Sequence, residues 1–238
     1  MNKDLLNKIE IFLIGGNSTI GNAILDGVLE KHKNKDIEII SFIRTEHNVD
    51  IRGKEIKVNN YSETIDYINI NYSKSDSYKI FIISFGVLTE EKKSNNFSEN
   101  LQYHLDINTF KTFKIFKLLV ESKKLLEIHI VSSILGDFIR PSLYSYSLSK
   151  NMLEVLIDNM SITKNVIKKV FIWKPAFVES KLNEGRKSTF LKTNTTKIKN
   201  TVSKKIIGGK YYIPRYSVFF TFIAKFASPI VNWIDKKV

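Results

Sequence analysis

A glycine-containing turn near the N-terminus joins an apolar run directly to an amphipathic segment. Ile9 to Ile14 has the continuous apolar pattern of a buried strand, and Ile20 to His32 repeats apolar residues at helical spacing. Between them lies Gly-Gly-Asn-Ser-Thr-Ile-Gly, residues Gly15 to Gly21. A plain glycine turn is one interpretation. The strand before it and the helix after it favour the other, the first unit of a parallel α/β sheet that binds a pyrophosphate at its turn.

The rest of the chain continues this alternation of strands and helices. Further strands are expected at Ile37–Ile43, Ile56–Val58, Lys79–Ser84, Ile128–Val131, Val166–Trp173 and Tyr211–Ile213. Helices are expected at Ser62–Ile70, Phe97–Leu119 and Ser145–Met160, the second with apolar Leu101, Leu105, Ile107, Phe110, Phe113 and Phe116. Alternation without a repeat or linker predicts one α/β domain over residues 1–238, a Rossmann-type doubly wound parallel sheet. Polar residues 179–209 are interpreted as a substrate lid that includes one helix.

The charge balance restricts the class of partner. The chain has 238 residues and a net charge of +13. It has no cysteine, and this absence excludes disulfides and thiolate metal sites. A basic chain suits phosphates, nucleic acid or an anionic membrane. The lysines are spread along the chain without a nucleic-acid-binding motif, so we expect no nucleic acid partner.

The four histidines show no metal-ligand spacing, so no metal site is expected. No signal peptide is visible, and a cytoplasmic location is the default expectation.

A tyrosine–lysine pair is the strongest chemical signal. Tyr146 and Lys150 stand four residues apart in an expected helix, so they share one face of it. An ammonium beside a phenol favours the phenolate and would lower a tyrosine pKa from about 10 towards the range useful for proton transfer. Ser133 lies thirteen residues upstream, just after an expected strand. Tyr144 has Leu148 at the same spacing and lacks such a partner.

The glycine turn, Ser133 and the Tyr146–Lys150 pair, in this order and at these spacings, resemble the short-chain dehydrogenase/reductase family. The resemblance implies that Tyr146 exchanges a proton with the substrate oxygen and that Ser133 hydrogen-bonds that oxygen. It implies that Lys150 tunes the tyrosine and holds a nicotinamide ribose. Asn108 matches the family's fourth catalytic position, which holds a water that relays protons to the lysine.

The same resemblance implies a nicotinamide dinucleotide cofactor. Arg44 follows the second strand, where an acidic residue would hold a ribose 2′-hydroxyl and an arginine favours a 2′-phosphate, so NADP is expected and NAD is the alternative. The chain departs from the family where Thr19 replaces a glycine of the turn and Ala176 replaces a glycine after Pro175. The expected cofactor contacts are Gly15, Asn17, Ser18, Thr19, Ile20, Gly21, Arg44, Asn60, Ser84, Phe85, Gly86, Tyr146, Lys150, Pro175, Val178 and Ser180.

The C-terminal tail, residues 216–238, is apolar and aromatic. Lys225 and Pro229 interrupt it before a membrane-spanning length accumulates. Two interpretations stay open: an interfacial helix on an anionic membrane, and packing against the protein or a partner subunit. The tail, the glycine turn and residues Ser84 to Leu88 resemble the decaprenylphosphoryl-ketoribose reductase branch of the family. That branch reduces a ketosugar on a polyprenyl phosphate at the membrane.

These features predict an oxidoreductase that interconverts a ketone and a secondary alcohol, on a sugar or a lipid-linked sugar, peripheral to the inner face of the cell membrane. A soluble reductase of 3-oxoacyl chains or small ketones is one alternative. A catalytically silent cofactor-binding protein is another. Family members pair through the helices that correspond to Phe97–Leu119 and Ser145–Met160, so the resemblance also implies a homodimer or homotetramer.

Overall fold

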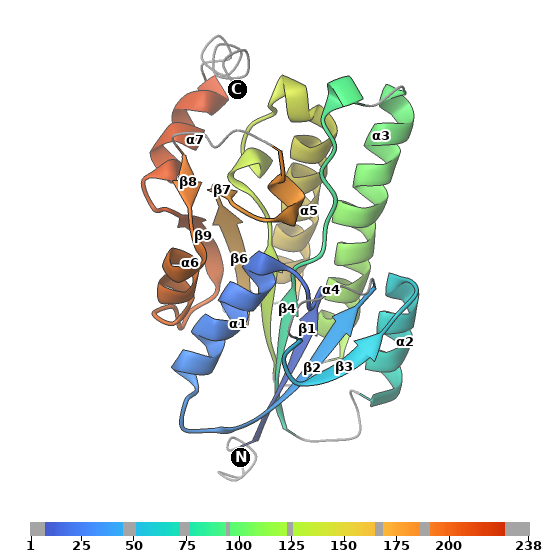
Figure 1. The fold of residues 1–238 in the computed structure, drawn as a ribbon, viewed down its shortest axis with the longest axis vertical. Coiled ribbons are helices and arrows are strands. Elements are labelled where there is room, and N and C mark those ends of the chain that lie inside the picture. Colours follow the sequence, from blue (N-terminus) through green and yellow to red (C-terminus); the bar gives the residue numbers. More distant parts are fainter. Residues whose placement is uncertain are drawn as a thin grey trace.

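Seven parallel strands form one twisted sheet in the order β3-β2-β1-β4-β5-β6-β9 (Figure 1). The computed structural model describes residues 8–44, 51–71, 77–93, 96–122, 126–164, 169–185 and 191–226. The strands are β1 (Lys8–Ile14), β2 (Asp36–Ile43), β3 (Lys54–Lys57), β4 (Tyr78–Ile83), β5 (Leu126–Val131), β6 (Val170–Pro175) and β9 (Gly209–Ile213). The chain winds outward from β1 to β3 and then returns to β4, so the expected doubly wound Rossmann-type sheet is confirmed.

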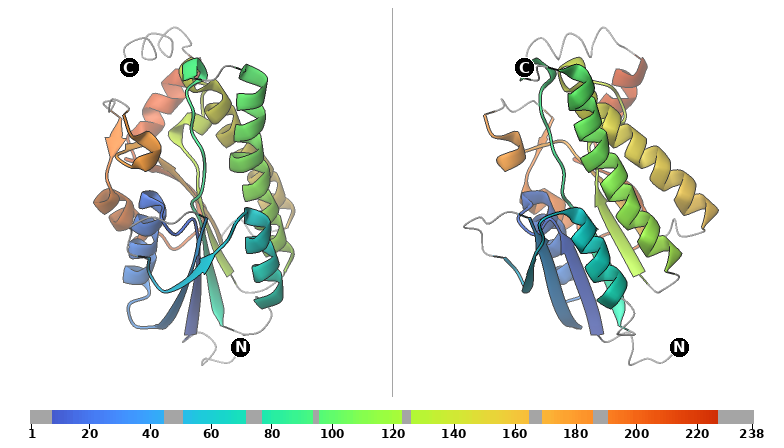
Figure 2. Two further views of the ribbon diagram at one scale, coloured as in Figure 1. Left: turned by 45° about the vertical axis from the view of Figure 1, so that its right-hand side comes forward. Right: turned by 90° about the vertical axis from the view of Figure 1, so that its right-hand side faces the viewer.

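Helices cover both faces of this sheet (Figure 2). One face carries α1 (Thr19–Lys31) and α6 (Thr195–Val202). The other carries α2 (Tyr61–Asn71), α3 (Phe97–His104), α4 (Thr112–Glu121) and α5 (Tyr144–Thr163). The last described helix, α7 (Ser217–Phe226), packs near the carboxyl ends of the strands. Short strands β7 (Phe177–Val178) and β8 (Lys192–Thr193) pair outside the main sheet.

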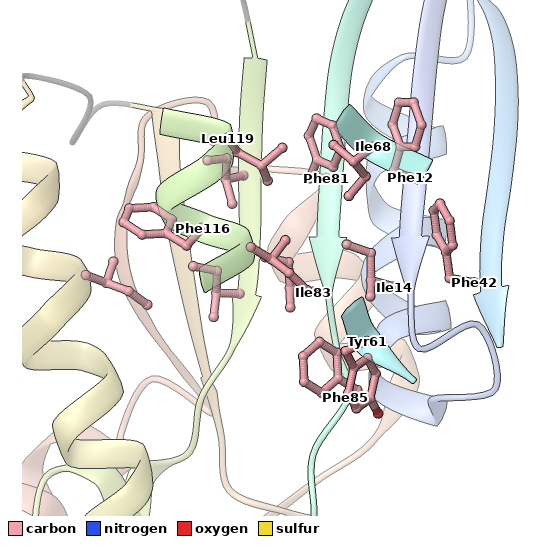
Figure 3. Close-up of a cluster of buried hydrophobic side chains, with 14 of the residues drawn as sticks. Phe12, Ile14, Phe42, Tyr61, Ile68, Phe81, Ile83, Phe85, Phe116 and Leu119 are labelled. Atoms are coloured by element: carbon pink, nitrogen blue, oxygen red, sulfur yellow. The ribbon is translucent and has the colours of Figure 1, made fainter. Parts of the chain in front are cut away.

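Aromatic and branched aliphatic side chains fill the layer under α2, α4 and α5 (Figure 3). Phe12 of β1 and Phe81 of β4 stack with ring centroids 4.7 Å apart. Phe116 and Leu119 of α4 are fully buried against the strands. Strands buried on both faces require continuous apolar runs, and this is why the sequence pattern located them.

The expected helix Phe97–Leu119 contains a wide turn. Residues Leu105–Lys111 form a π-helical segment between α3 and α4. The wider turn shifts the helical phase, so three consecutive residues, Ile107, Asn108 and Thr109, all face inward. Phe110, expected on the apolar face, is instead 49% exposed.

Part of the segment interpreted as a lid belongs to the body of the fold. Helix α6 lies against α1 and buries Ile198 and Val202 in the core. Gly27 of α1 makes this approach possible, because a methyl group there would lie 2.6 Å from the Val202 Cβ atom. Of the interpreted lid, residues 186–190 lie outside the described residues. Of the tail, residues 227–238 lie outside them as well.

A buried polar cluster ties β5 to α1. Glu127 Oε1 lies 2.9 Å from Lys31 Nζ and 2.8 Å from His129 Nε2. The Trp173 indole can only donate, so its 2.9 Å bond to His129 Nδ1 leaves the histidine proton on Nε2, facing Glu127. Burial opposes ionisation of Glu127, but the hydrogen bond from His129 and the charge of Lys31 lower its pKa to about 2.

We expect acid to destabilise the fold through Glu127. Because its folded-state pKa lies below the ordinary value of 4.5, its stabilisation is present above 4.5 and is lost as pH falls towards about 2. Glu127→Gln should therefore flatten the fall of the thermal midpoint between about pH 5 and pH 3. Asp36→Asn, at an exposed carboxylate on β2, is the control. If Glu127→Gln and the wild type lose the same stability over this interval, the assignment is wrong.

Candidate active site

The glycine turn is held by hydrogen bonds within it and from Asn22, the next residue. Gly15 has φ +96°, a backbone conformation that favours glycine. Ser18 caps α1, its Oγ accepting from the Gly21 backbone N–H at 3.0 Å. Asn22 Nδ2 donates to the carbonyls of Gly16 at 2.7 Å and Ser18 at 3.0 Å. Asn22 did not stand out in the sequence, because asparagine in a helix has no family motif to mark it.

The end of β4 fits closely against this turn. Ser84 Oγ donates at 3.2 Å to the Ile14 and Gly15 carbonyls. A methyl group at Gly21 would lie 2.7 Å from the Ser84 Cβ atom, so only glycine fits there without movement. The turn and β4 therefore present backbone at the point where the sheet reverses its winding direction, which is where nucleotides bind in such sheets.

An aromatic pair lies beside the carboxyl end of β2. Tyr61 stacks on Phe85 with ring centroids 3.8 Å apart. The Arg44 guanidinium lies over the Tyr61 ring, 5.6 Å from its centroid. Asn60 is exposed, and its Oδ1 accepts from the Ser62 N–H at 2.8 Å at the start of α2. Arg44 therefore lies over the aromatic pair at the end of β2, whereas the Asn60 side chain caps the start of α2.

Tyr146 and Lys150 lie one turn apart on α5, and both are buried. Lys150 Nζ lies 5.9 Å from the Tyr146 ring centroid and donates to the Val131 carbonyl at 3.1 Å. Burial lowers the pKa of Lys150 to about 8, and the charge of Glu154 partly opposes this. The lysine therefore stays largely charged at neutral pH, beside the phenol.

The π turn directs Asn108 to the same place. Its Oδ1 accepts from the Val87 N–H at 2.8 Å, and its Nδ2 donates to the Val87 carbonyl at 3.0 Å and to Ser149 Oγ at 3.0 Å. A methyl group at Gly86 would lie 3.0 Å from Asn108 Oδ1 and 3.7 Å from Lys150 Nζ. The structure therefore brings together Gly86, Asn108 and Lys150, which the sequence predicted to share one site. Tyr146 lies one helical turn from Lys150.

Ser133 begins a short 3-10 helix, Ile134–Gly136, that packs on α5. Its Oγ accepts from the Leu135 N–H at 3.2 Å. A methyl group at Gly136 would lie 3.4 Å from the Lys150 carbonyl carbon, so this short helix lies directly against the turn of α5 that carries Lys150.

His104 is a neighbour of the pair that the sequence did not mark. It is fully buried, and its ring lies edge-on to Tyr146 with centroids 6.4 Å apart. Its Nε2 accepts from the Thr89 N–H at 3.1 Å, so the ring proton is on Nδ1, which donates to the Asn100 carbonyl at 2.8 Å. The signal available was only a lone histidine in a helix, which usually indicates packing.

Three observations fit a dinucleotide in this site. Gly15 and Gly86 let the glycine turn, the end of β4 and the π turn pack closely together here, since a methyl group at Gly15 would lie 3.0 Å from the Phe85 nitrogen and one at Gly86 3.0 Å from Asn108 Oδ1. The N-terminus of α1 is directed at the turn, as pyrophosphate binding requires. Beyond Pro175 and buried Val178, the Ser180 Oγ is buried without a hydrogen-bond partner among the described residues. The residues around the glycine turn are therefore compatible with a bound nicotinamide dinucleotide.

No family model and no curated protein matches this chain. Solved structures do. A short-chain dehydrogenase from Burkholderia cenocepacia in complex with NADP superposes with a TM-score of 0.70 at 15% identity, over 92% of this chain and 93% of that one. Aldohexose dehydrogenase from Thermoplasma acidophilum gives 0.64 at 16% identity, over 88% and 93%. A gluconate 5-dehydrogenase from B. cenocepacia, with NADP and tartrate, gives 0.69 at 10% identity, over 90% and 96%. The chain has the fold of the short-chain dehydrogenases, and no branch of them is singled out.

Among the described residues, no helix is both long enough and apolar enough to cross a membrane. Within the same ranges, no group of three or more His, Asp or Glu side chains is placed to hold a metal ion.

Proposed function

We propose that the protein is an NAD(P)H-dependent oxidoreductase that interconverts a ketone and a secondary alcohol. The observation that carries this proposal is the convergence of Tyr146, Lys150 and Asn108 beside Gly86, next to the glycine turn. The fold of the solved dehydrogenases supports it. A catalytically silent cofactor-binding protein, the alternative outside the enzymes, would not need a buried lysine beside a buried tyrosine.

The roles of the side chains follow from their chemistry. When bound, the nicotinamide cofactor supplies or accepts the hydride. In the direction of reduction, Tyr146 donates its phenolic proton to the substrate oxygen, and Ser133 donates a hydrogen bond to the same oxygen. Tyr146 then becomes a phenolate, which the Lys150 ammonium stabilises. Asn108 holds the π turn beside Lys150 through its bonds to Val87.

NADP is the cofactor that this site favours. Arg44 is exposed at the end of β2, and its contact with the Tyr61 ring restricts its conformations. A guanidinium held there suits a 2′-phosphate. Two of the similar solved structures hold NADP, which supports the same choice.

We expect Arg44→Ala to weaken NADPH binding and to spare NADH binding. Loss of a charge-assisted arginine–phosphate contact removes on the order of 1.5–3 kcal/mol, or a tenfold to hundredfold rise in the NADPH dissociation constant. Titration of both nucleotides by fluorescence measures this. The control is Arg52→Ala, whose guanidinium pairs with Asp26 instead. Equal losses for the two nucleotides would show that Arg44 does not read the 2′-phosphate.

For the substrate, we propose a sugar or a lipid-linked sugar. The aldohexose and gluconate dehydrogenases among the similar structures support a sugar. A panel of ketosugars, 3-oxoacyl thioesters and small ketones, with NADPH oxidation as the readout, separates this proposal from its alternative. Turnover confined to 3-oxoacyl thioesters or small ketones would contradict the sugar.

Helix α7 supports a lipid-linked sugar as substrate, because its large apolar side chains face outward and its small ones face inward. It buries the small residues Ser217, Thr221 and Ala224 and exposes large apolar ones. Phe219, Phe222 and Phe226 are 62%, 63% and 77% exposed. A helix that left such a face in water would lose its hydrophobic stabilisation, so this aromatic face needs a partner. Figure 1 shows α7 at the carboxyl end of the strands, the end at which the site lies.

We propose that an anionic lipid bilayer covers this aromatic face. In sequence, residues 185–234 contain ten Lys or Arg and no Asp or Glu, although Lys199 pairs with Glu30 and Lys210 with Asp158. Arg215 and Lys225 are exposed at the two ends of α7. Aromatic side chains with basic flanks are typical of interfacial helices. A lipid-linked sugar would then reach the site from the same surface. A peripheral position on the inner face of the cell membrane follows from this proposal.

The wild type is expected to sediment with anionic vesicles and much less with neutral ones, and added salt should weaken the binding. Phe222→Asp should reduce binding at least about tenfold, because it places a charge in the apolar layer. The matched control is Ile162→Asp on α5, where the native side chain is 67% exposed. Equal binding by both variants, or none by the wild type, would refute the membrane contact. A concentration-dependent dimer abolished by Phe222→Asp would identify a second copy as the occupant instead.

A homodimer or homotetramer formed through α3, α4 and α5 stays a prediction. Exposed apolar side chains on these helices and on the π turn between α3 and α4 support it, namely Phe97, Tyr103, Phe110, Met152 and Val155.

A further inference from the structure

A cluster of buried charges lies behind the catalytic turn of α5. Glu154, one turn after Lys150, contacts Lys174 Nζ through both carboxylate oxygens, at 2.6 and 2.7 Å. Ser132 Oγ donates to Glu154 Oε1 at 2.5 Å. Lys174 Nζ also lies 3.0 Å from Asp137 Oδ1, and Lys210 Nζ lies 3.2 Å from Glu154 Oε2. The Lys174 side chain has no exposed surface and that of Glu154 has 4%.

The position of each partner in the chain links this cluster to the site. Ser132 directly precedes Ser133. Lys174 directly precedes Pro175, where the expected nicotinamide-contacting segment begins. Glu154 shares α5 with Tyr146 and Lys150. One carboxylate therefore contacts or belongs to three of the chain segments that form the site.

Stability alone does not account for such a cluster. Removing two charges from water is costly, and an apolar pair of similar volume usually serves the core as well or better. The reaction described above uses neither Glu154 nor Lys174. What the pair adds, and an apolar pair lacks, is a directional contact that fixes relative position.

We propose that Glu154 is a positioning residue that holds the Ser133 segment and the start of the Pro175 segment in register with the Lys150 turn of α5. The Ser132 hydroxyl and the Lys174 ammonium are the two contacts through which it acts. Gly136 is part of the same arrangement, since a methyl group there would lie 2.7 Å from Glu154 Oε1.

The same carboxylate also acts on Lys150 through its charge. The charged groups around this turn are Glu154 on α5, Asp137 after the short helix Ile134–Gly136, Lys174 on β6 and Lys210 on β9. The Tyr146 phenol and the neutral His104 ring lie on the site side. Burial lowers the pKa of Lys150, and Glu154 raises it. Without Glu154, Lys150 would lose its proton at a lower pH and stabilise a phenolate less well.

Two measurements test the positioning role of Glu154. Both use the protein without nucleotide or substrate, so a negative result would count against this role and not against the proposed oxidoreductase function. Carbon-13 labelling of lysine Cε lets each lysine be titrated by NMR, and Lys150 is assigned by its loss in Lys150→Met. Wild-type Lys150 should titrate near pH 8. In Glu154→Gln we expect its midpoint to fall to a lower pH, because the negative charge that raises the pKa of Lys150 is lost. Asp158→Asn, one turn further along α5 and also paired with Lys210, is the control and should change nothing.

Hydrogen exchange tests the positioning itself. In Glu154→Leu/Lys174→Met, the core should stay folded, because an apolar pair replaces the ion pair. The amides of Ser132, bonded to the Trp173 carbonyl, and of Gly136, bonded to the Ser133 carbonyl, should exchange at least about tenfold faster. Amides of β1 and β4 should keep their protection, which reports global stability. The proposal would be overturned if Lys150 titrates in Glu154→Gln as it does in the wild type. It would also be overturned if the amides of Ser132 and Gly136 exchange in the folded double variant at the wild-type rate.

Discussion

Tyr146→Phe is expected to abolish turnover while leaving nucleotide binding nearly unchanged. The substitution removes the phenolic hydroxyl proposed as the proton donor, and it keeps the ring that packs beside His104 and Lys150. General acid catalysis of this kind contributes on the order of 10²–10⁴ in rate, so a loss of at least about 10²-fold is predicted. The rate of NADPH oxidation with the best carbonyl of the panel, alongside an NADPH titration, provides the measurement.

Tyr144→Phe is the matched control for this experiment. Tyr144 begins the same helix, is 37% exposed and packs against Phe97, away from the lysine. It should lose no more than about twofold, the effect expected when no charged or reacting group is nearby. Turnover of Tyr146→Phe within a few-fold of the wild type would exclude Tyr146 as the proton donor.

Gly21→Ala should have the second large effect, on the nucleotide turn. The added methyl group would lie 2.7 Å from Ser84 Cβ and 3.2 Å from Ser18 Cβ, so α1 and β4 must move apart. Overpacking of this kind costs about 1–3 kcal/mol of stability. A displaced N-terminus of α1 would no longer meet the pyrophosphate of the proposed cofactor, so NADPH affinity should fall at least about tenfold.

A second substitution tests whether the steric clash with Ser84 causes this loss. Ser84→Gly removes the atoms that the new methyl group would strike. The double variant Gly21→Ala/Ser84→Gly should therefore bind NADPH more tightly than Gly21→Ala alone, although it loses the Ser84 bonds to the Ile14 and Gly15 carbonyls. If the double variant binds no better than the single one, the close packing of Gly21 on Ser84 is not the reason for its importance.

The sequence predicted the parallel sheet well, because its strands are buried on both faces. Ile9 to Ile14 and Lys79 to Ser84 are nearly continuous apolar runs, and β1 and β4 lie within one residue of them. The long helix was predicted in extent but not in phase. Its π turn depends on contacts of Asn108 with Val87 and Ser149, which are distant in sequence, so periodicity alone placed Phe110 inside.

Local geometry predicted only the part of the site whose residues are close in sequence, whereas Asn108 and Gly86 came from the family resemblance. Tyr146 and Lys150 are four apart on one helix, and helix geometry alone brings them together. Glu154 and Lys174 were not predicted, because a charge in an apolar stretch is usually solvated and its burial depends on a partner twenty residues away. For α7 the sequence left two interpretations open, because an apolar pattern alone does not say whether the aromatic side chains face the core or a membrane.

Binding of NADPH to the purified wild-type chain, followed by the fluorescence of the nucleotide, tests the central claim most directly. We predict saturable binding at one site per chain with micromolar affinity, and a loss of at least about tenfold in Gly21→Ala. A folded wild-type protein that leaves NADPH and NADH fluorescence unchanged up to millimolar concentration would contradict a nicotinamide-dependent oxidoreductase.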